Sequence, residues 1–263
     1  IEQKWCVSKD DTRVPMFIIR KKEITLDGMN PTLLLGYGGF SSSINPFFLK
    51  SWIPWLERGG VFVVANIRGG GEFGSEWHTG GIKENKQNSF DDFIACSEFL
   101  ISEKYTNTEK LGIIGGSNGG LLVSAALVQR PELFKAGVAQ VPLTDMVRFP
   151  KFGIASRWVH EYGDPSTKED LERILKWSPY HNVREGIEYP NMLFTTGEND
   201  TRVNPLHSRK MTAMLQSANG KNKTLLFTEK EAGHIANKPI SKIVESQSLI
   251  ITFFAQELGL LVV

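Results

Sequence analysis

Residues 111–127 read LGIIGGSNGGLLVSAAL, and this stretch decides the fold. Its first four residues are mostly apolar and suit a buried strand, and the residues from Leu121 onward suit a helix. Between them lies a glycine-rich turn with Ser117 at its apex. The glycines remove Cβ atoms where strand and helix must approach closely, and they tolerate the strained backbone that would push Ser117 into a cleft. The stretch therefore predicts a strand, a tight turn and a helix that together present a serine.

A G-x-S-x-G turn between a strand and a helix is typical of the nucleophile elbow of α/β-hydrolases. The rest of the chain agrees, because short continuous apolar runs alternate with helical patterns, as expected for strands covered on both faces. The expected strands are 14–19, 32–37, 61–66, 111–114, 136–141, 191–196 and 224–228. The expected helices are 46–57, 89–102, 118–129, 205–216 and 243–257.

This alternation predicts an α/β-hydrolase fold, with a mostly parallel central sheet and helices on both of its faces. It shows no internal repeat and no low-complexity linker, so we expect one domain. Between residues 143 and 183 the alternation lapses into an aromatic-rich stretch. Insertions at the carboxyl ends of strands commonly shape a binding pocket, and we expect this one to do so.

The partners of the serine follow from the chemistry of the nucleophile. A serine hydroxyl needs a base to take its proton, and the base needs an acid to hold its tautomer. In α/β-hydrolases the acid follows the serine and the histidine comes last. Asp200 and His234 lie just past two successive expected strands downstream of Ser117, where catalytic groups collect in open sheets. Glu198, which lies nearer its strand end, stays open as an alternative acid.

The other histidines fit the role of base poorly. His78 and His160 have no strand immediately before them, and His181 precedes the expected acid and breaks the order. His207 falls in the first turn of an expected helix, where we predict a side chain that faces solvent. The sequence therefore favours His234.

The oxyanion of the tetrahedral intermediate also needs hydrogen-bond donors. One donor is the backbone N–H of the residue after the nucleophile, Asn118. The second is expected from the loop GYGGF at 36–40, which follows an earlier strand. Either a glycine N–H or the hydroxyl of Tyr37 would serve, and the residues alone leave both open.

Composition excludes several other classes. The chain of 263 residues has 30 basic and 29 acidic side chains, so it lacks the positive charge of a nucleic-acid-binding protein. No apolar run approaches the roughly 20 residues that cross a bilayer, and no spacing of residues predicts a metal site. The glycine cluster at 68–74 lacks a phosphate-binding pattern and predicts a packed loop.

Two cysteines, Cys6 and Cys96, make no disulfide framework, and Cys96 is expected to be a small core residue. A glycan on the sequon at Asn199 would also sit beside a candidate catalytic residue. We therefore expect a reducing compartment and a cytoplasmic location.

Several more segments resemble one family of peptidases. They are GGSNGGLL at 115–122, GYGGF at 36–40, ANIRGGGE at 65–72, KQN at 86–88, FDDF at 90–93 and AGH at 232–234. On these segments the chain resembles, from about Glu2 to its end, the prolyl oligopeptidases, which are serine peptidases with an α/β-hydrolase catalytic domain. Asn118 favours the prolyl branch, since related oligopeptidases that prefer basic residues usually carry alanine there.

The resemblance implies roles for individual residues of the catalytic machinery. By this analogy Ser117 is the nucleophile, Asp200 the orienting acid and His234 the base. The hydroxyl of Tyr37 is implied as the second oxyanion donor, beside the N–H of Asn118.

The resemblance also implies a proline pocket. Arg202 would grip the carbonyl of the residue before proline, and the indole of Trp158 would stack on the proline ring, for which a flat aromatic wall is suited. The side chain of Asn118 would contact the substrate backbone. Further walls of the pocket would be Phe40, Tyr162 and Val203. Without the resemblance, ordinary core packing would be the simpler interpretation of Trp158 and Tyr162.

The chain departs from the family pattern at several points. Pro142-Leu143 replaces a smaller Gly-Val pair, and Ile235 follows the histidine where glycine is frequent. We expect Leu143 to line the pocket and these changes to reshape it. Family members also carry a β-propeller that filters large substrates and a short amino-terminal piece. Neither is in this chain, so we expect residues 1–263 to be the catalytic domain of a longer protein with an intramolecular propeller.

The sequence therefore predicts a serine oligopeptidase that cleaves short proline-containing peptides on the carboxyl side of proline. It would act through an acyl-enzyme, without metal or cofactor, and without nucleic acid or membrane as partner. Two alternatives stay open. One is a related serine hydrolase of other specificity, such as an acyl-peptide hydrolase, a basic-specific oligopeptidase or an esterase. The other is an inactive hydrolase-like module that binds partners.

Overall fold

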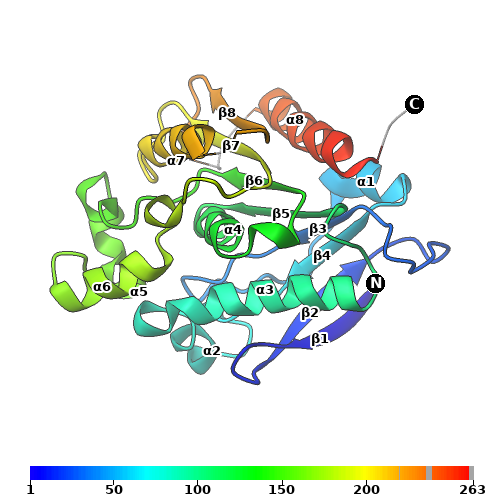
Figure 1. Ribbon diagram of the computed structural model, residues 1–263, viewed down its shortest axis with the longest axis horizontal. Coiled ribbons are helices and arrows are strands. Elements are labelled where there is room, and N and C mark those ends of the chain that lie inside the picture. Colours follow the sequence, from blue (N-terminus) through cyan, green and yellow to red (C-terminus); the bar gives the residue numbers. More distant parts are fainter. Residues whose placement is uncertain (219, 235–238, 261–263) are drawn as a thin grey trace.

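The computed structural model describes residues 1–218, 220–234 and 239–260, and its strands form one sheet (Figure 1). The order of the strands across this sheet is β1-β2-β4-β3-β5-β6-β7-β8. Their bounds are β1 Glu2–Val7, β2 Arg13–Ile19, β3 Thr32–Leu35, β4 Val61–Ala65, β5 Leu111–Gly116, β6 Ala136–Gln140, β7 Asn191–Gly197 and β8 Thr224–Glu229. From β4 to β8 all neighbours pair in parallel, so the predicted mostly parallel sheet is confirmed.

The edge formed by β1 and β2 differs from the rest of the sheet. Both strands pair antiparallel, β1 with β2 and β2 with β4. Strand β1 was not among the expected strands, because its residues alternate between buried or half-buried and exposed instead of forming a continuous apolar run. An edge strand with one wet face carries a weaker apolar signal than a strand covered on both faces.

Helices cover both faces of the sheet. They are α1 Ile53–Glu57, α2 Ser75–Thr79, α3 Lys86–Ser102, α4 Asn118–Gln129, α5 Val159–Tyr162, α6 Lys168–Trp177, α7 Leu206–Ala218 and α8 Ile240–Leu258. In Figure 1, α8 (red) and α1 lie together on the side opposite α3. The two core layers follow the pleat of the strands, since Val63 of β4 packs in the layer with α3 and α4 while Phe62 packs in the layer with α1 and α8. Helices on both faces were predicted, and this arrangement confirms them.

Two expected stretches differ in detail. The helix expected at 46–57 begins only with a short 3₁₀ turn at Lys50–Trp52 followed by α1. Pro54 lies in the first turn of α1, where its fixed φ and missing N–H suit a helix start. The aromatic-rich stretch at 143–183 contains short helices, of which α6 is capped by the Thr167 hydroxyl accepting from the N–H of Asp170 at 3.3 Å.

The loop after β4 is packed, as predicted. Arg68 is buried and donates through its backbone N–H and its Nε to Asp92 of α3, at 3.0 and 2.9 Å. The Ser89 hydroxyl donates in turn to the Arg68 carbonyl at 2.8 Å. The segments 65–72 and 90–93 are thus parts of one buried contact between this loop and α3. Cys96, farther along the same helix, is a buried core residue, as predicted.

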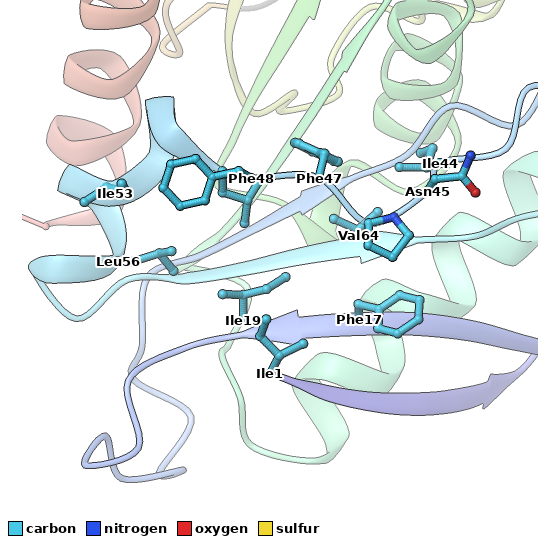
Figure 2. A pocket seen from close by; sticks show the side chains of 12 residues that line it. Ile1, Phe17, Ile19, Ile44, Asn45, Phe47, Phe48, Ile53, Leu56 and Val64 are labelled. Atoms are coloured by element: carbon cyan, nitrogen blue, oxygen red, sulfur yellow. The ribbon is translucent and has the colours of Figure 1, made fainter.

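An apolar pocket of about 340 Å³ lies away from the elbow. Figure 2 shows Phe17 and Ile19 of β2 on one side of it and Phe47 and Phe48 on the other. Among the described residues, its lining includes none of the predicted catalytic side chains. The described helices include none long and apolar enough to cross a membrane.

Candidate active site

Ser117 lies between the end of β5 and the start of α4. Its φ is +57° and its ψ is −116°, a conformation that is uncommon for a residue with a side chain. Its N–H donates to the Gln140 carbonyl of β6 at 2.8 Å, and its carbonyl accepts from the N–H groups of Gly120 and Leu121 at 3.0 and 3.1 Å. These bonds hold the strained turn, so Ser117 has the backbone of a nucleophile elbow.

The glycines of this turn are required by close backbone contacts. A Cβ on Gly115 would lie 2.3 Å from the carbonyl oxygen of Gly119, and a Cβ on Gly119 would lie 2.7 Å from the carbonyl oxygen of Gly36. Both distances are far below van der Waals contact. The first contact brings strand and helix together across Ser117, and the second brings the turn against the 36–40 loop.

An acid–histidine pair follows β7 and β8. The Nδ1 atom of His234 lies 2.7 Å from Oδ2 of Asp200, which is buried. The other carboxylate oxygen, Oδ1, accepts from the N–H groups of Arg202 and Val203, both at 2.9 Å. The carboxylate is therefore held on both oxygens. It is oriented so that His234 would present Nε2 as the free nitrogen.

The remaining candidates for acid and base lie elsewhere. Glu198 is exposed and its Oε2 accepts from the N–H of Glu231 at 3.2 Å, so the structure pairs His234 with Asp200 instead. The prediction that His207 faces solvent is wrong, because its side chain is 1% exposed. Its Nδ1 accepts from the N–H groups of Thr144 and Asp145 at 3.2 and 3.1 Å. Burial lowers the pKa of His207 to about 4, which keeps the ring neutral. The helical pattern of the sequence does not reveal the burial of His207, because residues of the aromatic-rich stretch at 143–183 pack over α7.

The 36–40 loop follows β3 and lies against the elbow. The Nδ2 group of Asn118 donates to the Tyr37 carbonyl at 2.6 Å, and the Nζ of Lys86 donates to the Gly38 carbonyl at 2.8 Å. Burial raises the pKa of Tyr37, a change that the nearby charge of Arg202 opposes and that of Glu161 reinforces. A phenol that stays protonated is a hydrogen-bond donor, which is the role implied for Tyr37.

The side chain of Asn118 is 1% exposed and bonded within the protein. Besides the bond to Tyr37, its Oδ1 accepts from the Tyr162 hydroxyl at 2.8 Å. The contact of this side chain with a substrate backbone, which the resemblance implied, stays a prediction. Asn118, the first residue of α4, thus joins the elbow to the loop and to the aromatic residues.

Three aromatic residues gather beside this loop. The ring of Phe40 packs edge-on against Trp158 and Tyr162, with centroids 6.1 and 5.7 Å apart. Trp158 and Tyr162 are buried, and Phe40 is partly buried against them. Edge-to-face packing at these distances is favourable for aromatic pairs. The sequence placed Trp158 and Tyr162 four positions apart, and the fold adds Phe40 from a distant part of the chain.

The other predicted pocket residues differ in exposure. Arg202 is exposed, and its charge opposes the rise in the pKa of Tyr37 and of Tyr162 that burial causes. Val203 and Leu143 are buried in the core layer that also holds Trp158. The expectation for Ile235 lies outside the described residues.

Three polar residues that sequence reasoning did not assign to the site also lie here. Glu161 is fully buried, with Oε1 accepting from the Phe40 N–H at 2.7 Å and Oε2 at 2.9 Å from Nε2 of His78. Lys86 is 1% exposed, and burial lowers its pKa to about 8 while the charge of Glu161 opposes that change. The KQN segment at 86–88 was a signal for Lys86, but no spacing along the chain links these three residues to Phe40.

The strand order, the elbow after β5, the acid after β7 and the histidine after β8 define the α/β-hydrolase class. The sequence model of the prolyl oligopeptidase family matches residues 47–260, and the chain belongs to this family. It is 47% identical, over 82% of its length, to an uncharacterized peptidase of Sinorhizobium fredii. It is 45% identical, over 95% of its length, to a prolyl endopeptidase of Dictyostelium discoideum.

Solved structures of relatives superpose closely on this chain. One prolyl endopeptidase matches over 99% of the chain with a TM-score of 0.97 and 46% identity. Prolyl oligopeptidase B from Galerina marginata, bound to a 35mer hydrolysis and macrocyclization substrate, matches over 99% of the chain with a TM-score of 0.96 and 41% identity. The chain covers 39% and 37% of these two structures and 30% and 34% of the two curated relatives above. It therefore spans about a third of the proteins that it resembles.

Proposed function

We propose that residues 1–263 are the catalytic domain of a serine oligopeptidase that hydrolyses short peptides on the carboxyl side of proline. The observation that carries this proposal is the position of Phe40. It shares a loop with Tyr37, which lies against the elbow, and its ring packs on Trp158 and Tyr162. One loop would thus join the proposed oxyanion donor to an aromatic wall suited to a proline ring.

The proposed reaction has two halves. In the first, the Ser117 hydroxyl oxygen attacks the carbonyl carbon of proline while His234 Nε2 takes the hydroxyl proton. Asp200 holds the tautomer and stabilises the imidazolium that forms, and the oxyanion is held by the Tyr37 hydroxyl and the Asn118 N–H. The C–N bond then breaks and the proton passes from His234 to the leaving amine. In the second half, a water molecule gives its proton to His234 while its oxygen attacks the ester carbon. The bond between that carbon and Ser117 Oγ then breaks, His234 returns the proton to Oγ, and the acid is released.

The residues around the chemistry would select the peptide. Arg202, which is exposed and whose charge opposes the rise in the pKa of Tyr37, is proposed to bind the carbonyl before proline, and Val203 and Leu143 to support the pocket from the core. A β-propeller in the longer protein would admit only short peptides. The cytoplasmic location and the single-domain boundary at 1–263 stay predictions.

The proposal predicts a strong preference for proline. A blocked glycyl-prolyl fluorogenic amide is expected to be cleaved with a kcat/KM about 10²-fold or more above the alanyl and arginyl analogues, because only proline fills the aromatic pocket. The comparison is made on the full-length protein. Faster cleavage of the arginyl amide or of an aryl ester would contradict proline specificity and favour a related hydrolase. Cleavage of nothing, with no fluorophosphonate labelling, would favour a binding module.

Tyr37→Phe is expected to lower kcat for the prolyl amide about 10²–10³-fold and to change KM little. The hydroxyl would bind the oxyanion, which exists only after attack, so its loss affects the transition state and not the bound substrate. The control is Tyr105→Phe, whose hydroxyl contacts Glu2 far from the elbow. Native kcat in the Tyr37 variant would instead assign the second donor to a glycine N–H of the loop.

A further inference from the structure

A buried carboxylate lies behind the candidate oxyanion loop. Glu161 of α5 is 0% exposed and is reached by groups from two other elements. Its Oε1 accepts from the Phe40 N–H at 2.7 Å, and its Oε2 lies 2.9 Å from Nε2 of His78 on α2. Burying a charged carboxylate is costly unless hydrogen bonds replace its water, and here both oxygens have a partner. One of those partners is the backbone of the loop itself.

The loop at this point is in an uncommon conformation. Phe40 has a φ of +56° and Ser41 a φ of +52°, so two successive residues with side chains lie in the left-handed region. Such residues persist only where the surroundings hold them. The bond from the Phe40 N–H to Glu161 is made at the first of the two. One residue earlier, the side chain of Asn118 fills the space beside Gly39, so the loop is confined on both sides.

We propose that Glu161 is a positioning residue of the catalytic site: its buried carboxylate holds the Phe40 N–H, and with it the loop that places Tyr37 at the oxyanion and Phe40 against the proline pocket. This inference rests on the proposed function, because it gives Glu161 its importance through the roles proposed for Tyr37 and Phe40. Glu161 also directly precedes Tyr162, so the same short helix supports both walls of the pocket.

Titratable groups from four elements interact with Glu161. They are His78 of α2, Lys86 at the start of α3, Tyr37 of the loop and Tyr162 of α5. Loss of the Glu161 charge would lower the pKa of Tyr37, which that charge helps to raise, and would lower the pKa of Lys86 further below about 8. Both groups would then lose a proton at lower pH, so both effects move the alkaline limit of activity in the same direction.

Two substitutions test the length of the Glu161 side chain and its charge separately. Glu161→Asp keeps the charge but is one methylene shorter, so it withdraws the acceptor from the Phe40 N–H. It is expected to lower kcat for the prolyl amide, and the rate of fluorophosphonate labelling, about ten- to a hundredfold. The alkaline limb of its kcat/KM pH profile is expected to stay where it is in the unaltered protein. Glu161→Gln keeps the length and an acceptor oxygen but removes the charge. It is expected to keep most of the activity at neutral pH and to move the alkaline limb of kcat/KM to lower pH.

The matched control is Asp170→Asn. Asp170 lies in the same insertion and also accepts from a backbone N–H, that of Asp164 at 2.8 Å, but it does not contact the 36–40 loop. We expect native kinetics in this variant. Thermal melting of all three variants separates misfolding from a local effect, and the Gln variant tests the inference if the Asp variant does not fold. Native kcat and labelling rate in Glu161→Asp, or a native alkaline limb in Glu161→Gln, would overturn the proposal.

The labelling rate keeps this inference separate from the proposed function. The fluorophosphonate probe needs the nucleophile and the oxyanion donors but no proline. If the unaltered protein labels at Ser117 and cleaves no prolyl amide, the proline specificity fails while the effect of Glu161→Asp on labelling still tests the positioning role. If the prolyl amide is cleaved and the Glu161 variants behave as the unaltered protein, the positioning role alone fails.

Discussion

Ser117→Ala is expected to lower kcat/KM for the prolyl amide about 10⁶-fold, to the level left by binding and oxyanion stabilisation alone. Ser117 is the one residue that the strained elbow presents between β5 and α4, with its φ of +57° held by three backbone bonds. Those bonds use the backbone and not the hydroxyl. The substitution therefore removes the nucleophile and leaves the turn intact, and the loss is expected in kcat without loss of stability.

The measurement pairs peptide hydrolysis with covalent labelling. Mass spectrometry after fluorophosphonate treatment is expected to place the adduct on Ser117 and to find none in the alanine variant. Ser124→Ala is the matched control, because Ser124 lies on the next turns of α4, where its hydroxyl bonds the Gly120 carbonyl at 2.8 Å. We expect this variant to label and to cleave as the unaltered protein does. An adduct that persists in Ser117→Ala would show that another residue is the nucleophile.

Asp200→Asn is expected to lower kcat about 10⁴-fold with little change in KM. The reason lies in the two N–H groups, of Arg202 and Val203, that point at Oδ1. They require an acceptor, so the amide oxygen of asparagine takes that position and its NH₂ group faces Nδ1 of His234. Nδ1 must then accept, which places the proton on Nε2 and leaves the ring unable to take a proton from Ser117. The expected loss comes from the wrong tautomer and not from a changed fold.

Glu198→Gln is the control for this prediction, since Glu198 is an exposed carboxylate two residues away and contacts the N–H of Glu231. We expect its kcat/KM to match that of the unaltered protein. Equal losses in the two variants, or a larger loss in Glu198→Gln, would make Glu198 the orienting acid and would contradict the observed contact as the working geometry.

The elements that the sequence predicted well are those with a local signal. Strands of the parallel sheet are continuous apolar runs, and α4 begins and ends where its pattern does, at Asn118 and Gln129. The elbow was predictable because its glycines and serine lie within six residues, 115–120. The edge strand β1 and the short helices of the insertion were missed, because half-buried or very short elements carry little periodicity. His207 was misjudged for a related reason, since a helix pattern does not reveal what packs over the helix.

The candidate site also has features that the sequence predicts and features that it does not. The order of serine, acid and histidine could be inferred from strand ends, because parallel strands bring their carboxyl ends to one edge of the sheet. Spacing alone left open which carboxylate meets the histidine, since Glu198 and Asp200 differ by two positions and the choice depends on how the loop after β7 turns. Only the family resemblance implied Asp200.

By itself the sequence determined the fold class and the family and predicted the nucleophile, because each is written in contiguous residues that act over a turn or a strand. Only the tertiary structure decided the surroundings of the chemistry. Glu161 meets the Phe40 N–H across 121 positions of the chain, and Lys86 meets the Gly38 carbonyl across 48. Buried charges are stable only with partners that replace their water, and such partners come from whichever segments the fold brings together. No local sequence pattern encodes these contacts between distant segments.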